Sequence, residues 1–476
     1  MLGLFKGEPL HCQRFMLETT LINTPLERSP IAILGVPFDN VTAAEAVALI
    51  GRMVEFRQPH YGATVGVDFL VQSREDVELR RILFDAHLVL AGEKQIVRAS
   101  KILGNELPEV VAIENLVPQL LTLAEKNGWR VFFLGGAMAE TALTEKVRAK
   151  FPKLPIAGVY APPEKPLLEM DHREILHRLR EARPDILLIA FGFSKQEKWI
   201  AMNIREAAIP FALGVGMDWN SVSGTAPSSP RSGNGWKFNL ALLKQWRRLR
   251  AKKTDGLAVA AKPAPDAFGN LIIRAPERLG AAEVQSAQAE WLQAVERGHV
   301  MFDLSDTVFS DSTGVGALIR LRKRARELSH QFFLISPRPP VAAALKLMKL
   351  DEFFNIQTGL NGAYILMENA AGAPAVISGV QQTELQIRWV GEVTALNATE
   401  LGMHTESELS QASPGMTVVI DLSRVSFVDS TGIGLMVRFK KNLQRRGMIL
   451  KFINPSVTVR NVLQYAQLEE FLLTEK

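Results

Sequence analysis

The sequence Asp-Ser-Thr-Gly occurs twice in this chain, at residues 311–314 and 429–432. Each copy follows a predicted strand and precedes a predicted helix. Short side chains that carry oxygen, such as Asp311 and Ser312, can cap the unpaired N–H groups at the start of a helix. A phosphate on the serine would also meet the positive end of the helix dipole and add a charge of about −2 to an exposed surface. The motif therefore indicates either a plain helix cap or a phosphorylation site at Ser312 and at Ser430.

A second set of polar residues stands at the ends of apolar strands in the first half of the chain. Gly135 and Gly136 end one such strand and could offer backbone N–H groups to a pyrophosphate, assisted by the N-terminus of the next helix. A tight turn is the other interpretation of this glycine pair. Tyr160 could stack on a nucleotide base or lie in a surface turn.

The charged segment at residues 195–198, Lys-Gln-Glu-Lys, follows an apolar strand that ends at Gly192. A solvated run of charges is the usual explanation for such a segment. Its position at the carboxyl end of a buried strand instead favours a pocket, because open α/β sheets bind their ligands there.

The elements that must position these residues follow an α/β pattern. Apolar strands are predicted at 31–36, 63–71, 88–92, 131–136, 186–192 and 211–216. Helices are predicted between them at 43–56, 116–127 and 139–151. This alternation predicts an open, doubly wound, Rossmann-like domain over residues 1–253, with a linker at 254–268.

The rest of the chain is a tandem duplication. The segment that begins at Phe302 matches the segment that begins at Ile420 with an offset of 118 residues, without a gap over about 50 positions. Both copies read strand, helix, strand, helix, which predicts two small α/β domains at 269–367 and 376–476 with a linker at 368–375.

Composition excludes several classes of protein. The 476 residues include 47% hydrophobic and 22% charged residues, which argues against wholesale disorder and against a collagen-like chain. The single cysteine, Cys12, excludes a disulfide framework and a cysteine-rich zinc site, and we expect no metal. The start of the chain lacks the apolar core of a signal peptide, and no run reaches the roughly 18 apolar residues of a membrane span. We expect a cytoplasmic protein.

A basic stretch without acidic residues runs from Trp219 to Thr254. Within it, Phe238, Leu242, Trp246 and Leu249 fall on one helical face. Such a helix suits the anionic inner face of a membrane, so residues 236–253 could make a peripheral contact. The same apolar face could instead pack on its own domain. Nothing in the stretch resembles a nucleic-acid-binding motif, so we expect no nucleic-acid partner.

The two C-terminal copies resemble STAS domains, the fold of anti-sigma factor antagonists, through Asp-Ser-Thr-Gly placed between a strand and a helix. The resemblance implies phosphorylation of Ser312 and Ser430 by a partner kinase and release of that partner. It also implies a simpler role as docking modules for an anti-sigma-factor-like kinase or another STAS partner.

The first half resembles the WecB/TagA/CpsF glycosyltransferases over about residues 30–250. The resembling blocks occur in the family's order: IAILGVPFDNVTAAEAVALI, DAHLVLAGEKQIVRASKILG, RVFFLGG, VYAPPEKP, PDILLIAFGFSKQEKWI and FALGVGMDWNSVSGTAP. The most specific block is Ser-Lys-Gln-Glu-Lys-Trp at 194–199.

This resemblance implies transfer of a hexosamine-type sugar from a UDP-sugar to a polyprenyl-linked or other surface-glycan acceptor, without a cofactor, and it allows a homo-oligomer. A carboxylate would act as general base on the acceptor hydroxyl. The implied catalytic residues are Glu93 and Asp68. The residues implied in nucleotide-sugar binding are Thr64, Gly135, Gly136, Tyr160, Lys195, Gln196, Glu197 and Asn220.

The chain departs from the family at the positions that matter for catalysis. Gly92 stands where the family has an aspartate, Gly66 where it has an asparagine, and Asn220 where it usually has an aspartate. Glu93, one position along, could supply the base. Alternatively, the domain binds a nucleotide sugar without turning it over and acts as a sensor, since a displacement of about 1 Å can cost a factor near 100 in rate.

Overall fold

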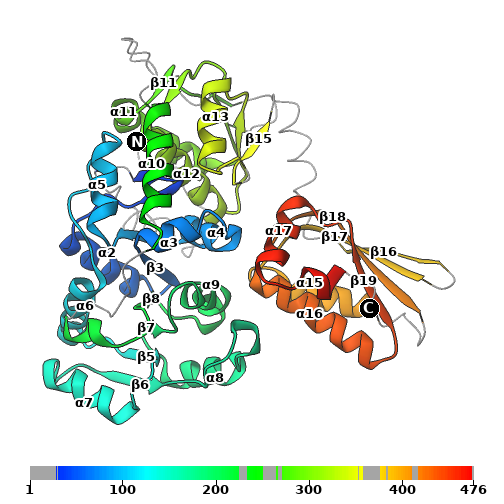
Figure 1. The fold of residues 1–476 in the computed structure, drawn as a ribbon, viewed down its shortest axis with the longest axis horizontal. Coiled ribbons are helices and arrows are strands. Elements are labelled where there is room, and N and C mark those ends of the chain that lie inside the picture. The colour runs from blue at the N-terminus through cyan, green and yellow to red at the C-terminus, as the bar shows by residue number, and fades with distance from the viewer. Residues whose placement is uncertain are drawn as a thin grey trace, which may run out of the picture.

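The computed structural model describes residues 28, 30–224, 233–249, 264–265, 271–351, 353–357, 376–381, 384–409 and 416–473. They form an N-terminal domain, a middle domain and a C-terminal domain, each built around a β-sheet (Figure 1). The middle domain continues the N-terminal domain at one end, and the C-terminal domain lies against the side of both (Figure 1).

The N-terminal domain contains a sheet of six parallel strands in the order β4-β3-β8-β7-β5-β6. Its strands are β3 (His60–Val65), β4 (Leu88–Ala91), β5 (Val131–Gly135), β6 (Ile156–Tyr160), β7 (Ile186–Ala190) and β8 (Phe211–Gly214). Its helices are α2 (Ala43–Phe56), α3 (Val67–Gln72), α4 (Val77–Asp85), α5 (Lys94–Ile102), α6 (Ile113–Asn127), α7 (Glu140–Lys150), α8 (His172–Ala182), α9 (Lys195–Ala207) and α10 (Gly235–Leu249), with short 3-10 turns η1 (Leu167–Glu169) and η2 (Asn220–Ser223).

The sheet separates two apolar layers. Phe132 and Leu134 of β5 pack in one layer with α8 and α9, whereas Val131 and Phe133 pack in the other with α6 and α7. The strand after β5 is β6, on one side, and the strand after β7 is β8, on the other side. The connections therefore diverge between β5 and β7, which makes this point the topological switch point of a doubly wound sheet.

The predicted doubly wound α/β fold is confirmed, with two local corrections. The segment at 31–36 does not join the sheet, because β1 (Ile31–Ile33) and β2 (Val36–Phe38) form an antiparallel hairpin of their own. The strand predicted at 63–71 ends at Val65, and helix α3 starts two residues later. Both segments are short apolar runs, whose periodicity does not distinguish a sheet strand from a hairpin or a helix.

The middle and C-terminal domains share one topology, which agrees with the predicted duplication. The middle domain contains β9 (Ala264–Pro265), β10 (Leu271–Arg274), β11 (Arg278–Leu279), α11 (Ala281–Arg297), β12 (Val300–Asp303), β13 (Phe309–Ser310), α12 (Ser312–Glu327), β14 (Phe332–Ile335), α13 (Pro339–Leu347) and β15 (Asn355–Gln357). The C-terminal domain contains β16 (Val376–Gln381), β17 (Glu384–Val393), α15 (Ala398–Leu409), β18 (Thr417–Val428), α16 (Ser430–Arg445), β19 (Ile449–Ile453), α17 (Val457–Tyr465) and α18 (Glu469–Leu473).

Equivalent residues of the two copies pair in the same register. Asp303 of β12 lies opposite Ile335, and Asp421 of β18 lies opposite Ile453. Strand β9 falls inside the stretch predicted as a linker at 254–268 and pairs with β10, so the middle sheet begins within that stretch. The second predicted linker, 368–375, lies outside the described residues.

The middle domain shares a hydrophobic core with the N-terminal domain. Phe84, at the end of α4, is buried among middle-domain residues, with its ring centroid 4.1 Å from that of Phe353. Asp85 forms an ion pair with Arg326 of α12. Gly316 lies against the carbonyl of Pro30, where a larger residue would not fit. The two domains are therefore one packed unit.

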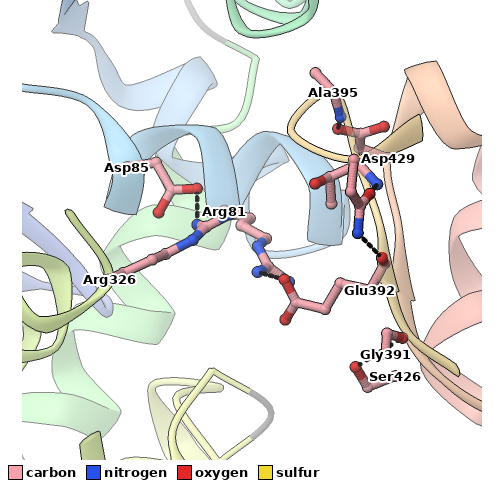
Figure 2. Close-up of polar contacts among 10 residues, drawn as sticks. Arg81, Asp85, Arg326, Gly391, Glu392, Ala395, Ser426 and Asp429 are labelled. Carbon is pink, nitrogen blue, oxygen red and sulfur yellow. Dashed lines mark hydrogen bonds and ion pairs between the residues drawn. The ribbon is translucent and has the colours of Figure 1, made fainter. Parts of the chain in front are cut away.

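The C-terminal domain docks mainly on helix α4. Arg81 forms an ion pair with Glu392 (Figure 2). Its guanidinium also lies 4.2 Å from the ring centroid of Phe427. One turn earlier, the Glu78 carboxylate accepts hydrogen bonds from the Ser430 backbone N–H at 2.5 Å and from the Ser430 hydroxyl at 2.7 Å. Helix α4 therefore contacts all three domains.

Substituting Phe84→Ala should loosen the middle domain from the N-terminal domain. Loss of a buried phenylalanine costs about 3–5 kcal/mol. We expect the single unfolding transition of the full chain to separate into two in calorimetry. The exposed Leu240 gives a control, since Leu240→Ala should leave the transition unchanged. A single transition in Phe84→Ala at the original temperature would contradict a shared core.

Candidate functional site

The switch point between β5 and β7 is lined by glycines that make room for one tryptophan. The Trp219 indole N–H donates a hydrogen bond to the Gly135 carbonyl at 3.1 Å, and the ring is buried. A side chain at residue 136 would collide with this ring, and Gly136 also has a positive φ of 75°. Glycine is required here by both sterics and backbone conformation.

One part of the sequence prediction at this point is wrong. The Gly136 N–H donates to the Ala190 carbonyl at 2.8 Å, so it is not offered to a pyrophosphate. The hydrogen bonding between β5 and β7 continues one residue beyond the end of β5, so the Gly136 N–H is already bonded within the sheet. Helix α7, whose N-cap is Ala139, begins a few residues later and still presents its N-terminus at this edge.

Helix α9 places the Lys-Gln-Glu-Lys segment at the same edge of the sheet. Its N-cap, Ser194, has a φ of 66°, which is unusual for a residue other than glycine and is often found at functional sites. The Gln196 side chain accepts a hydrogen bond from the Gly216 N–H at 3.2 Å and donates one to Glu197 at 2.8 Å. Both side chains are buried. The segment is therefore not a solvated charge run.

Glu197 is a buried carboxyl group with a shifted proton affinity. Burial raises its pKa to about 7, although hydrogen bonds from Gln196 and from the backbone act in the opposite direction. Its second carboxyl oxygen has no hydrogen-bond partner among the described residues. A buried carboxyl that titrates near neutral pH is a common feature of functional sites.

The remaining residues predicted to contact a nucleotide sugar lie around this centre. The Lys195 ammonium donates to the Lys165 carbonyl at 2.6 Å. The Tyr160 ring at the end of β6 lies 4.3 Å from the Arg178 guanidinium, which covers one face of the ring. The Asn220 N–H donates to Asp218 at 2.9 Å within the turn that follows Trp219.

Thr64 and Glu93 lie at the carboxyl ends of β3 and β4. The Thr64 hydroxyl is buried and has no hydrogen-bond partner among the described residues. The Glu93 carboxylate occupies the space above Gly66, where a side chain would collide with it, and accepts a hydrogen bond from the Val67 backbone N–H. Because Gly66 has no side chain, the Glu93 side chain can occupy this space.

Asp68 is the other carboxylate at this end of the sheet. The Asn234 amide, just before α10, donates to Asp68 at 2.9 Å. Burial raises the pKa of Glu93, and the negative charge of Asp68 adds to this effect, whereas the hydrogen bond from Val67 opposes it. Glu93 is therefore better suited to accept a proton near neutral pH than an ordinary glutamate.

The two groups of residues face the same edge at a short separation. Strands β3 and β7 are separated only by β8. Two strand spacings amount to roughly 10 Å. A ligand of nucleotide-sugar length could therefore contact Gln196 and Thr64 at once.

The two serines of the repeated motif are not exposed. Asp311 and Asp429 cap α12 and α16, while Ser312 and Ser430 are the first helical residues. Ser312 is fully buried, and its hydroxyl lacks a hydrogen-bond partner among the described residues. The exposed surface expected around both serines is therefore wrong, because each motif helix packs against the N-terminal domain.

Glu78, which the sequence analysis did not select, connects Ser430 to Lys198 of helix α9. The Lys198 ammonium pairs with Glu78 at 2.9 Å and with Asp76 at 2.8 Å. Burial alone would lower the pKa of Lys198, but the two carboxylates outweigh it and raise that pKa to about 12. Lys198 belongs to the quoted motif, whereas nothing in the sequence around Glu78 indicates a contact 352 residues away.

The basic helix α10 uses the predicted apolar face within the protein. Phe238 and Leu242 are buried in the N-terminal core, so the alternative of packing on its own domain is correct for that face. A different set of apolar side chains is exposed: Trp236 (65% exposed), Leu240 (47%) and Leu243 (41%). Residues 250–253 of the predicted membrane contact lie outside the described residues.

The described residues contain neither a helix suited to span a membrane nor a cluster of metal-binding side chains. None of the described helices combines the length and apolar character needed to cross a bilayer. Within the same residues, no cluster of three or more His, Cys, Asp or Glu side chains is arranged to hold a metal ion.

Substituting Glu197→Gln should make stability less dependent on pH. The folded-state pKa of about 7 exceeds the ordinary value of 4.5, so ionisation costs stability as the pH rises through this interval. The stability of Glu197→Gln relative to the parent chain should increase by about 2–3 kcal/mol between pH 5 and pH 8 in denaturant unfolding. The exposed Glu206 provides a control, Glu206→Gln. A difference that does not change with pH would contradict a raised pKa at Glu197.

Comparison with known families agrees with this architecture. Residues 31–255 match the model of the glycosyl transferase WecG/TagA/CpsF family. Residues 261–363 and 375–476 each match the STAS domain.

Similar proteins include two bacterial enzymes named N-acetylglucosaminyldiphosphoundecaprenol N-acetyl-beta-D-mannosaminyltransferase. The one from Bacillus spizizenii is 28% identical over 184 residues, which are 37% of this chain and 70% of the relative. The one from Staphylococcus aureus is 24% identical over 214 residues, which are 43% of this chain and 81% of the relative.

Similar solved structures are STAS proteins. A STAS domain protein from Planctomyces limnophilus is 24% identical with a TM-score of 0.22, covering 23% of this chain and 99% of that one. The unphosphorylated anti-sigma factor antagonist SpoIIAA is 26% identical with a TM-score of 0.18, covering 21% and 86%. By the family models, the N-terminal domain of this chain matches the WecG/TagA/CpsF glycosyl transferase family, and the two domains behind it each match the STAS domain.

Proposed function

We propose that this chain transfers a hexosamine-type sugar from a UDP-sugar to a lipid-linked or surface-glycan acceptor, under the control of its docked STAS pair. The names of the relatives support this class of donor and acceptor. The observation that carries the proposal is the position of the Glu93 carboxyl group above Gly66, at the same sheet edge as Gln196 and the switch point, where desolvation raises its pKa.

The donor would bind across the switch point. Its pyrophosphate would lie near the N-terminus of α7, and its uridine near Tyr160 and Lys195. The buried Thr64 hydroxyl, unpaired among the described residues, is available to hold the sugar. A ligand that forms a hydrogen bond with this buried hydroxyl removes the free-energy cost of leaving the hydroxyl unpaired.

Glu93 would act as the general base on the acceptor hydroxyl. Asp68 would keep its proton affinity high through the negative charge of its carboxylate. Proton transfer by such a base contributes roughly 100-fold to 10,000-fold to a rate.

Substituting Glu93→Gln in the full chain should lower UDP release from a panel of UDP-hexosamines by about 100-fold or more while leaving donor binding intact. The full chain is needed because the N-terminal domain shares its core with the middle domain. The exposed Glu106 offers a matched control, Glu106→Gln, with unchanged turnover. Full turnover in Glu93→Gln would exclude Glu93 as the base.

A second candidate function is a sugar-nucleotide sensor that binds the donor without transferring it. It is favoured by the hydrogen bond from Val67 to Glu93, which ties this carboxylate to the start of α3, and by Gly92 at the family's aspartate position. Donor binding without UDP release by the parent chain, in the same assay, would select this function.

The STAS pair would regulate either activity through its contacts with the N-terminal domain. Ser430 binds Glu78, and Glu78 binds Lys198 of the Ser-Lys-Gln-Glu-Lys-Trp block. A phosphate on the Ser430 hydroxyl would stand beside the Glu78 carboxylate, and like charges at such a distance repel strongly. Phosphorylation by a partner kinase would thus release the C-terminal domain. The Ser312 hydroxyl has no hydrogen-bond partner among the described residues, so the middle domain would act only as a docking module.

Substituting Ser430→Asp should mimic this release. We expect hydrogen exchange at residues 77–81 and 430–434 to increase at least about tenfold, because the docked state loses a charge-assisted contact and gains repulsion. The control Ser407→Asp adds the same charge on the exposed side of α15 and should leave exchange unchanged. Unchanged protection in Ser430→Asp would rule out a charge-sensitive contact.

The acceptor proposal also gives a role to helix α10. Its exposed Trp236, Leu240 and Leu243 lie among Lys237, Lys244 and Arg247, a combination that suits the surface of an anionic membrane. We propose a peripheral contact at the cytoplasmic face through this surface, which would bring the sheet edge near a polyprenyl-linked acceptor.

A further inference from the structure

A cavity of about 380 Å³ lies where the three domains meet. Arg205 of α9 lines it from the N-terminal domain, and Lys323 and Arg326 of α12 line it from the middle domain. Leu396 and Phe427 line it from the C-terminal domain. Its volume falls within the range of small-molecule sites, which often form at domain interfaces.

The cavity is separate from the proposed donor site. Arg205 is near the carboxyl end of α9, whereas Lys195 at the start of this helix faces the sheet edge. Ten helical residues span roughly 15 Å. A ligand in this cavity would therefore not compete with a nucleotide at the switch point.

Most charges around the cavity already have partners. Asp85 pairs with Arg326, and Glu327 pairs with Arg324. Glu78 pairs with Lys198, and Arg81 pairs with Glu392, which lies outside the cavity lining. The carboxylate of Asp429 accepts hydrogen bonds from the backbone N–H groups of Ala395 and Gly432 (Figure 2 shows the first).

Two cations are left without a carboxylate. Within the described part of the chain, no acidic side chain lies within ion-pair distance of Arg205 or Lys323. The Lys323 ammonium donates to the Ala86 carbonyl, a neutral acceptor. Burial lowers the pKa of Arg205, and the positive charge of Arg326 adds to this effect, whereas the carboxylates of Asp85 and Glu327 oppose it. An anion that contacts both Arg205 and Lys323 would give each cation an ionic partner.

The C-terminal domain contributes two apolar side chains to the cavity lining, Leu396 and Phe427, together with the carboxylate of Asp429. Leu396 is 47% exposed. Ile204 adds an apolar surface next to Arg205. A fitting ligand therefore has an anionic group at one end and a compact apolar or ring-shaped part at the other.

We propose that this cavity binds a small organic phosphate monoester. Its phosphate, with a charge between about −1.5 and −2 at neutral pH, matches the two unpaired cations. Its organic part contacts Leu396 and Phe427. Because the ligand touches all three domains, it stabilises the docked C-terminal domain, and docking in turn strengthens its binding.

The experiment uses phenyl phosphate as the probe and measures its binding to the full chain by calorimetry. We expect saturable binding that weakens about tenfold in Arg205→Gln and in Lys323→Gln, with UDP-sugar binding unchanged. Arg173, exposed on α8 and outside the cavity, gives a matched control, Arg173→Gln. Phenol, which lacks the phosphate, should not bind measurably.

Three outcomes would overturn the proposal: no saturable binding of phenyl phosphate to the full chain, equal affinity in the Arg205→Gln Lys323→Gln double variant, or equal binding of phenol. Ser430→Asp tests the contribution of the C-terminal domain and should weaken phenyl phosphate binding. Unchanged affinity in a Ser430→Asp chain whose hydrogen exchange has increased would mean that the site does not require this domain, and would overturn the three-domain site.

Discussion

The docking of the C-terminal domain depends on one buried carboxylate, that of Glu78. A carboxylate removed from water without partners costs several kcal/mol. The Glu78 carboxylate accepts hydrogen bonds from the N–H and the hydroxyl of Ser430 and forms an ion pair with the ammonium of Lys198. Its partners come from different domains, so the docked C-terminal domain and the N-terminal domain share a single electrostatic centre. That centre also raises the pKa of Asp429 to about 6, through burial first and the charge of Glu78 second.

The duplicated STAS domains use the same helix end in different ways. In the middle domain, α12 packs its first two turns against the N-terminal domain, with Ser312 buried and Gly316 against Pro30. In the C-terminal domain, α16 presents Ser430 to a charged group. A single added charge disrupts a hydrogen-bonded contact to a carboxylate more readily than it disrupts apolar packing. The two copies are therefore suited to different tasks, one to permanent attachment and the other to a contact that can be broken.

At the carboxyl edge of the N-terminal sheet, Gly66 and Glu93 are packed against each other. Gly66 leaves space that the Glu93 side chain occupies, and the Glu93 carboxylate takes a hydrogen bond from the start of α3. The positions where the family resemblance implies an aspartate and an asparagine hold Gly92 and Gly66. Desolvation and the charge of Asp68 raise the pKa of Glu93, whereas the hydrogen bond from Val67 that holds its carboxylate lowers it.

Sequence periodicity determined most of the fold. The alternation of apolar strands and amphipathic helices predicted the doubly wound domain, because each element must bury one face. The 118-residue repeat predicted two copies of one α/β domain, and the equal register at Asp303 and Asp421 follows from it. The motif Ser-Lys-Gln-Glu-Lys-Trp was placed correctly at a strand end, since the carboxyl ends of parallel strands meet at one edge of a sheet.

Tertiary structure alone decided which surfaces meet. The pairing of Glu78 with Ser430, the use of the Gly136 N–H within the sheet, and the inward face of α10 all depend on contacts between residues far apart in the chain. Local pattern specifies which face of an element is apolar, but not which other face covers it. For this reason the sequence alone identified the two motif serines, whereas only the tertiary structure showed that both are buried and that Ser430 contacts Glu78.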